Sequence, residues 1–263
     1  MKKSLQLVLL LLLSGSLFAQ TTEIGLVGGG SYYLGDLSPG VPFLEMKPAY
    51  GVIARYNYGT RWAFRLGGYR GKVAGDDAVS KANETRGLKF QSEITEISAV
   101  AEFNFFDFFI GTKKDNISPY IFAGVGFFMF NPKVDGTSLR DVGTEGQNVG
   151  FNGRKPYNLY SFCLPFGIGV KYSLSSRFGI SLEWGMRKTL TDYIDDVSTT
   201  YYLDGTKIDP ANLTEVYSDP TFEHKPNMQR GDSKTNDWYN FTILSITYKF
   251  YMFGKRGCPD QSH

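Results

Sequence analysis

The stretch RFGISLEWGMRK, residues 177–188, alternates between apolar and polar side chains. Its apolar parity holds Phe178, Ile180, Leu182, Trp184 and Met186. Side chains of a β-strand point alternately to opposite faces, so the stretch predicts a strand with one apolar and one polar face. Such a strand fits a soluble sandwich with its apolar face inward, or a membrane barrel with that face toward lipid.

Strand character recurs along the chain, separated by connections of two lengths. The predicted strands are 23–34, 49–58, 61–72, 91–106, 118–130, 158–172, 177–188 and 238–252. Turns 58–61, 107–117 and 173–176 are short, whereas 35–48, 73–90, 131–157 and 189–237 are long and polar. Short turns on one rim and long loops on the other are typical of outer-membrane barrels. We therefore predict an all-β fold, a transmembrane antiparallel up-and-down β-barrel of outer-membrane type with about eight strands.

Two details of this prediction stay open. The last strand alternates cleanly from Leu244 to Phe250 but loses phase near Ile243, where we expect a bulge. Ten strands are the alternative if the loop 189–237 hides another hairpin, for instance at 199–208.

The N-terminus indicates export. Residues 1–19 have a basic start, a short apolar run and a small residue at Ala19, which is typical of a cleaved secretory signal peptide. Beyond them no apolar segment approaches the roughly 20 residues of a membrane helix, so a membrane form would need a closed barrel. We predict a signal peptide at 1–19, a barrel with four long extracellular loops at 20–253, and a periplasmic tail at 254–263. The expected location is the outer membrane of a Gram-negative bacterium.

If the apolar parity faces lipid, the polar parity faces the lumen. Eight strands enclose a space that side chains nearly fill. The charged residues predicted to point inward are Arg55, Arg65, Glu96, Glu102, Lys171, Glu183, Arg187 and Lys249. Buried charges are tolerated when they are paired, so we favour an ion-pair network that closes the lumen over a transport path.

Composition and motifs argue against several functions. Removing Lys2 and Lys3 from the 28 basic residues leaves 26 against 26 acidic residues, so bulk attraction to nucleic acid is not indicated. The chain has two histidines and no C-x-x-C or H-E-x-x-H motif, so we expect no metal site and no cofactor. A lipid hydrolase would need His224 as its base, and His224 lies in a polar loop without strand periodicity. We therefore expect no catalytic residues and no enzyme activity.

The loop 189–237 holds ten acidic and four basic residues. The EF-hand order is absent, so a solvated acidic surface loop is favoured over a specific cation site, and the loop's ligand stays open. Interspersed aromatic residues indicate an ordered loop.

The short-turn rim and the tail are basic. They carry Arg61, Lys113, Lys114, Arg177, Lys255 and Arg256. This rim either docks an acidic partner or flanks the apolar belt by snorkelling, and both interpretations stay open. Cys163 lies on the lumen parity and Cys258 in the tail, roughly 20 Å apart by strand rise, so an internal disulfide is not expected. An intermolecular link, a docking feature and an unpaired, shielded thiol remain the three hypotheses for Cys258.

Three short motifs carry a family resemblance. They are SYYLGDL (31–37), PYIFAGVGFF (119–128) and KRGCPD (255–260). With these motifs the whole mature chain resembles the PorG-like outer-membrane proteins of the type IX secretion system. The resemblance implies a secretion component, not an enzyme, that sits in outer-membrane lipid and contacts a periplasmic ring of the PorK lipoprotein and PorN. It implies that the basic rim, the tail and Cys258 face that ring.

The expected function is therefore a scaffold or adaptor between the outer membrane and a periplasmic machine. The alternative is a free-standing barrel, adhesive or protective, whose long loops bind ligands. Oligomeric state and conductance of the lumen stay open.

Overall fold

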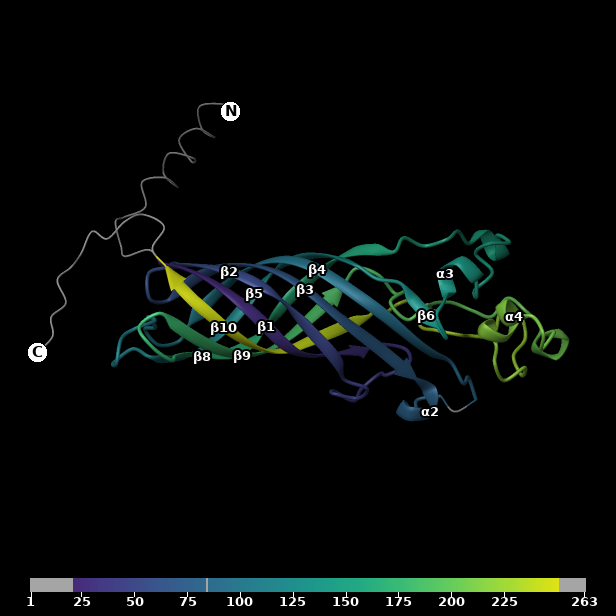
Figure 1. The fold of residues 1–263 in the computed structure, drawn as a ribbon. Helices are drawn as coiled ribbons and strands as arrows, with labels where there is room; N and C mark the ends of the chain where they lie inside the picture. The colour runs from purple at the N-terminus through teal and green to yellow at the C-terminus, as the bar shows by residue number, and fades with distance from the viewer. Residues whose placement is uncertain (1–20, 84, 251–263) are drawn as a thin grey trace, which may run out of the picture.

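Eight long antiparallel strands close into a barrel in the computed structural model, which describes residues 21–83 and 85–250 (Figure 1). The strands are β1 (Thr21–Leu34), β2 (Lys47–Tyr58), β3 (Trp62–Asp76), β4 (Lys89–Asn104), β5 (Ile117–Met129), β8 (Tyr160–Ser173), β9 (Phe178–Thr189) and β10 (Trp238–Phe250). Each pairs with its neighbour along the chain, and β1 pairs with β10 from Thr22↔Phe250 to Leu34↔Trp238. The predicted fold class and its eight strands are confirmed.

The wall turns its apolar side outward. Leu26, Leu66 and Ile168 are all more than half exposed, although they lie in the middle of long strands. In the opening stretch Leu182 is exposed, while its neighbour Glu183 is buried inside. A soluble barrel would place these side chains the other way round, so the alternation is that of a wall with an apolar exterior.

The long connections gather at one end and carry the small elements. These are α2 (Asp77–Ser80), β6 (Pro132–Val134), β7 (Thr137–Ser138), α3 (Leu139–Val142), η1 (Phe151–Gly153), η2 (Gly205–Lys207) and α4 (Leu213–Ser218). In Figure 1 the labelled ones, α2, α3, α4 and β6, all lie toward the same end of the barrel. Within the described residues no helix is both long and apolar enough to cross a membrane.

The bulge expected near Ile243 is wrong. Ile243 pairs in unbroken register with Gly29 on one side and Glu183 on the other. The apolar–polar alternation breaks down near Ile243 because the inward-facing residues there are themselves apolar: Tyr239, Phe241 and Ile243. The inside of the barrel is therefore apolar near the long loops, and a two-faced pattern cannot be read there.

The ten-strand alternative is also not observed. In the loop after β9, the described chain forms η2, α4 and a single bridge between Thr200 and Gln229.

One residue of the opening stretch departs from its predicted surroundings. Met186 has the outward parity of Trp184 but is buried. Its sulfur lies 3.4 Å from the side-chain nitrogen of Asn240. The Tyr32 ring next to it is covered by Phe43 of the first long loop, with ring centroids 5.1 Å apart. The first loop therefore folds over the outer wall at this end.

Two predicted segments lie outside the described residues. They are the signal peptide 1–19 and the tail 254–263.

Candidate functional site

A network of ion pairs fills the lumen near the short turns. Glu102 is its centre, with its carboxylate 2.9 Å from Arg55 Nε, 2.7 Å from Arg65 Nε and 2.6 Å from Lys171 Nζ. Arg55 Nη1 also lies 2.8 Å from Glu23, and Arg65 Nη2 lies 2.7 Å from Glu183. Three carboxylates thus face three cations, and these six residues are called the charge network below.

All eight residues predicted to face the lumen are buried inside the barrel. Beyond the charge network, Arg187 Nε lies 3.2 Å from Glu96, and the Tyr239 hydroxyl donates to the same carboxylate over 2.8 Å. Lys249 donates to the carbonyl of Ile110. Charges that are removed from water and paired hold the lumen closed, because separating any pair would leave a buried charge without its partner.

Glu23 belongs to the charge network but was missed in the sequence. It faces Arg55 directly in the pairing of β1 with β2. Its strand continues with several glycines, which hide the alternation that marks the other strands. The sequence feature that could have identified Glu23 is its parity, because it shares a strand face with the buried Val27.

The connection predicted as the short turn 107–117 folds across the mouth of the barrel. Phe108 and Ile110 are buried there, and Ile110 packs against Gly179, where an added Cβ would meet its side chain at 2.7 Å. The Gly111 amide donates to the Ser173 hydroxyl over 2.8 Å. The mouth on the short-turn rim is therefore covered by the protein itself.

Toward the long loops the lumen is filled by aromatic rings, called the aromatic layer. It consists of Tyr69, Phe90, Phe128, Phe130, Tyr239 and Phe241, all buried in one hydrophobic cluster. Tyr69 and Phe241 stack with ring centroids 5.6 Å apart, and the Arg187 guanidinium lies 4.8 Å from the centre of Phe241. The aromatic layer therefore sits directly on charged groups of the lumen.

Two buried arginines tie the four long loops into a single structure, called the cap. Arg86 donates to both oxygens of Asp77, over 2.9 and 2.6 Å, and to the carbonyls of Arg230 and Asp36, over 2.9 and 2.7 Å. Arg230 Nη1 donates to the Asp196 carbonyl over 2.5 Å and contacts Glu145 at 3.3 Å. The several donors of a guanidinium allow one side chain to join several loops.

The expectation of a solvated acidic loop is wrong for half of its carboxylates. Of the ten in 189–237, five are buried: Asp192, Asp195, Asp196, Asp219 and Asp237. Asp196 accepts a hydrogen bond from the Tyr157 hydroxyl over 2.6 Å, and burial raises the pKa of Asp196 to about 7. Among the described residues no group of three or more His, Cys, Asp or Glu is arranged to hold a metal ion.

His224 is placed more firmly than the sequence indicated. Its Nδ1 lies 2.9 Å from Asp219 Oδ1, and its ring stacks on Tyr201 with centroids 4.1 Å apart. Burial alone would raise the pKa of Asp219. Hydrogen bonds from His224 and Thr221 outweigh burial, so the pKa of Asp219 lies below its usual value. The nearby Thr221 hydroxyl approaches the same Nδ1, at 3.4 Å, whereas a catalytic triad needs the nucleophile on the other ring nitrogen.

The basic residues proposed for docking lie at the short-turn rim where the structure describes them. Lys113 and Lys114 are exposed, Arg61 Nε lies 2.6 Å from Asp107, and Arg177 donates to the Tyr248 hydroxyl over 2.9 Å. The other three, Lys255, Arg256 and Cys258, are outside the described residues. The buried Cys163 sulfur contacts the Tyr239 hydroxyl at 3.4 Å.

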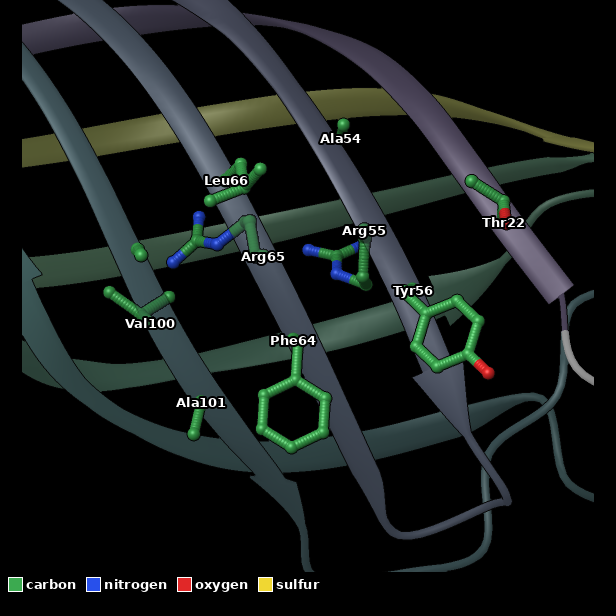
Figure 2. A pocket seen from close by; sticks show the side chains of 10 residues that line it. Thr22, Ala54, Arg55, Tyr56, Phe64, Arg65, Leu66, Val100 and Ala101 are labelled. Carbon is green, nitrogen blue, oxygen red and sulfur yellow. The ribbon is translucent and has the colours of Figure 1, made fainter. Parts of the chain in front are cut away.

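A depression of about 390 Å³ lies on the outer wall over β1 to β4 (Figure 2). Small side chains such as Ala54 and Ala101 form it, between larger ones such as Phe64 and Leu66. Apart from Thr22 and the Tyr56 hydroxyl, its outward side chains are apolar. Arg55 and Arg65 also line the depression, but their guanidinium groups pair with Glu102 in the lumen, so the outer surface offers shape and no reactive group.

These features define a closed eight-stranded antiparallel barrel with an apolar exterior, a filled lumen and a joined cap of loops. The chain belongs to the family described as "Domain of unknown function (DUF6089)", whose model matches residues 2–203. No curated protein matches the chain.

Several solved barrels are similar in outline. Neisserial surface protein A has 11% identity and a TM-score of 0.43, with 89% of this chain and 98% of that one covered. Ail of Yersinia pestis, in complex with the heparin analogue sucrose octasulfate, has 11% identity and a TM-score of 0.42, with 88% and 97% covered. The N-terminal barrel domain of OprF from Pseudomonas aeruginosa has 10% identity and a TM-score of 0.40, with 88% and 98% covered. Likenesses this distant say nothing about what this chain binds.

Proposed function

We propose that this protein is an outer-membrane barrel that serves as a scaffold or adaptor between the membrane and a periplasmic ring, in a type IX-like secretion machine. The observation that carries the proposal is the filled interior: the mouth, the charge network and the aromatic layer leave the described lumen packed with side chains. A barrel built in this way acts through its two rims and its outer wall.

Membrane residence rests on the outer wall. Exposed apolar side chains surround it, and Trp62, Phe103 and Phe105 form an aromatic group at the short-turn edge, with centroids 5.0 and 5.8 Å apart. Apolar belts bordered by aromatic residues suit the two zones of a bilayer. Outer-membrane lipid is the first partner in this proposal, and a Gram-negative outer membrane is the location.

The docking part of the proposal rests on the basic rim and on the resemblance to PorG-like proteins. Lys113 and Lys114 project from the segment that closes the mouth, so their charges are available to a periplasmic surface. Arg61 is already paired with Asp107 and contributes less. An acidic face of a PorK/PorN-like ring would complement this rim electrostatically.

The test is affinity purification of tagged protein from gently solubilised outer membranes. Wild type is expected to recover a periplasmic ring lipoprotein and its partner, and Lys113→Glu with Lys114→Glu is expected to lose them. The matched control is Lys155→Glu with Lys225→Glu, two exposed lysines of the cap, which should change nothing. A barrel that is recovered alone, even after cross-linking, would refute the adaptor role.

The alternative, a free-standing barrel with a ligand-binding cap, is favoured by one observation. Arg86 and Arg230 hold the long loops in one defined surface, which ligand recognition requires and membrane anchoring does not. Excising 201–228 between the bridged residues Thr200 and Gln229 should abolish surface binding and spare secretion if this alternative holds. Loss of secretion with intact surface binding would exclude it.

A further inference from the structure

Beneath the cap, one phenol lies between two carboxylates. The Tyr33 hydroxyl oxygen is 2.6 Å from Asp195 Oδ2 and 2.8 Å from Asp237 Oδ1, and all three side chains are buried. A phenol has a single proton and donates it once. The second short contact is favourable only if one carboxyl carries a proton and donates it to the phenol oxygen. Counting donors therefore places a proton on Asp195 or Asp237.

A neighbouring carboxyl points to protonation independently. Asp192 is more than nine-tenths buried, and its Oδ2 has no hydrogen-bond partner in the described part of the chain. Asp237 is the charged group that acts on it most strongly, and a hydrogen bond from the Ser198 side chain offsets burial and this repulsion only in part. An ionised oxygen without donors, facing a second carboxylate in a buried site, is strongly disfavoured relative to its protonated form.

The remaining hydrogen bonds leave the excess negative charge in place. The Val197 amide donates to Asp195 Oδ1 and the Ile194 amide to Asp237 Oδ2, each over 2.8 Å. Neither amide brings a full positive charge. The cluster is thus held by neutral donors.

The charged groups that face the cluster do not balance it. Asp36 from the first loop and Glu145 from the third add negative charge. Arg86 approaches Asp195, but its guanidinium already binds Asp77 and two carbonyls. Arg230 binds Glu145 and the Asp196 carbonyl, and its own carbonyl accepts a hydrogen bond from Arg86.

We propose that Tyr33, Asp192, Asp195 and Asp237 form a proton-operated latch, which holds the segment 190–198 against the barrel while protonated and releases it on deprotonation. Once the carboxyls are all ionised, Tyr33 satisfies only one of them and the others repel. Asp196 follows Asp195 directly and binds Tyr157, so movement of this segment also loosens the Arg230 contacts of the cap.

The direction of the pH response follows from the raised pKa values of these carboxyls. Burial raises the pKa of Asp237 and that of Asp192 to about 8, and raises the pKa of Asp195 well above its usual range. In an opened segment these carboxyls return toward about 3.9. Protonation of these carboxyls therefore stabilises the closed segment in full below about pH 4. This stabilisation is lost as the pH rises through about 8. The latch is closed in mildly acidic medium and opens in alkaline medium.

The first test is infrared spectroscopy of the full-length protein in lipid, titrated from about pH 6 to about pH 9. The account predicts the carbonyl band of a protonated carboxylic acid at the acidic end and its loss toward the alkaline end. Asp195→Asn and Asp237→Asn should each reduce that band, whereas Asp209→Asn, an exposed residue of the same loop, should not. Absence of the band in wild type at the acidic end overturns the proposal, even if the variants fail to fold.

The second test is amide hydrogen exchange of Ile194 and Val197, expressed as protection factors at each pH. Wild-type protection is expected to fall about tenfold or more from about pH 7 to about pH 9. Asp237→Asn, a neutral mimic of the protonated acid, should flatten that dependence, and Asp209→Asn should keep it. A pH-independent wild type, or an Asp237→Asn variant that responds like wild type, overturns the latch.

Discussion

The lumen and the cap both bury carboxylates, but they neutralise them differently. In the charge network, Glu23, Glu102 and Glu183 meet three cations at 2.6 to 2.9 Å. Under the cap, Asp192, Asp195 and Asp237 have no cation of their own; Tyr33 is shared by Asp195 and Asp237, and Asp192 Oδ2 has no hydrogen-bond partner among the described residues. Pairing gives the barrel a permanent closure, whereas protonation gives the cap a closure that depends on pH. Breaking either region on its own tests the contrast.

The largest effect is expected for Glu102→Ala. This change leaves Lys171 without its ion pair and takes one of two carboxylate partners from Arg55 and from Arg65. Removing one partner of a buried ion pair costs about 3–5 kcal/mol. Urea unfolding in lipid measures the loss. Glu93→Ala on the same strand is the control, because its pairs with Arg70 and Lys72 are about half exposed and water screens them. Equal losses in the two variants would contradict the account.

The cap should respond to Arg230→Met with a smaller, local effect. The change removes a hydrogen-bond donor from Glu145 and from the carbonyls of Asp196 and Ser218. Leaving a buried polar group unsatisfied costs about 1–3 kcal/mol of stability. Exchange protection in 196–231 should fall, while protection in the wall strands stays the same. A matching fall in the strands would show that cap and barrel unfold as one unit.

His224→Ala is expected to cost about 1–2 kcal/mol of cap stability, since it removes the hydrogen bond between the imidazole and Asp219 and the stacking on Tyr201, while the backbone amide of residue 224 keeps its bond to Asp219. The lipid A profile of cells that carry the variant should not change, because the Thr221 hydroxyl faces the wrong ring nitrogen for a triad. A changed profile, measured by mass spectrometry, would restore the lipid-hydrolase hypothesis.

The smallest effect is expected for Arg61→Ala. Its pair with Asp107 is about half exposed on both sides, where water screens the attraction and the pair contributes little to stability. Urea unfolding in lipid should therefore barely shift. A loss as large as that of Glu102→Ala would mean that the short-turn rim, not the charge network, holds the barrel together.

The wall was predictable because a two-residue period repeats along each strand. That period placed the strands and directed Arg55, Glu102 and Lys171 inward before any contact was known. It failed where both faces carry the same kind of residue. The aromatic layer around Phe241 looked like a loss of phase, and the glycines of β1 concealed Glu23.

The cap could not be predicted from the sequence, because its contacts join residues far apart in the chain. Arg86 and Arg230 lie in loops without periodicity, and Tyr33 is separated from Asp195 by 162 residues. A count of acidic residues in the loop indicated a solvated surface, yet burial depends on which donors the other loops supply. The inward fold of Phe108 was missed for the same reason.

Conductance of the purified protein in planar bilayers tests whether the lumen is filled and the barrel acts through its surfaces. A filled lumen should give no stable single-channel steps, in wild type and in a variant that lacks 201–228. Steady open channels in wild type would contradict this prediction, because ions would then pass where the charge network and the aromatic layer close the lumen.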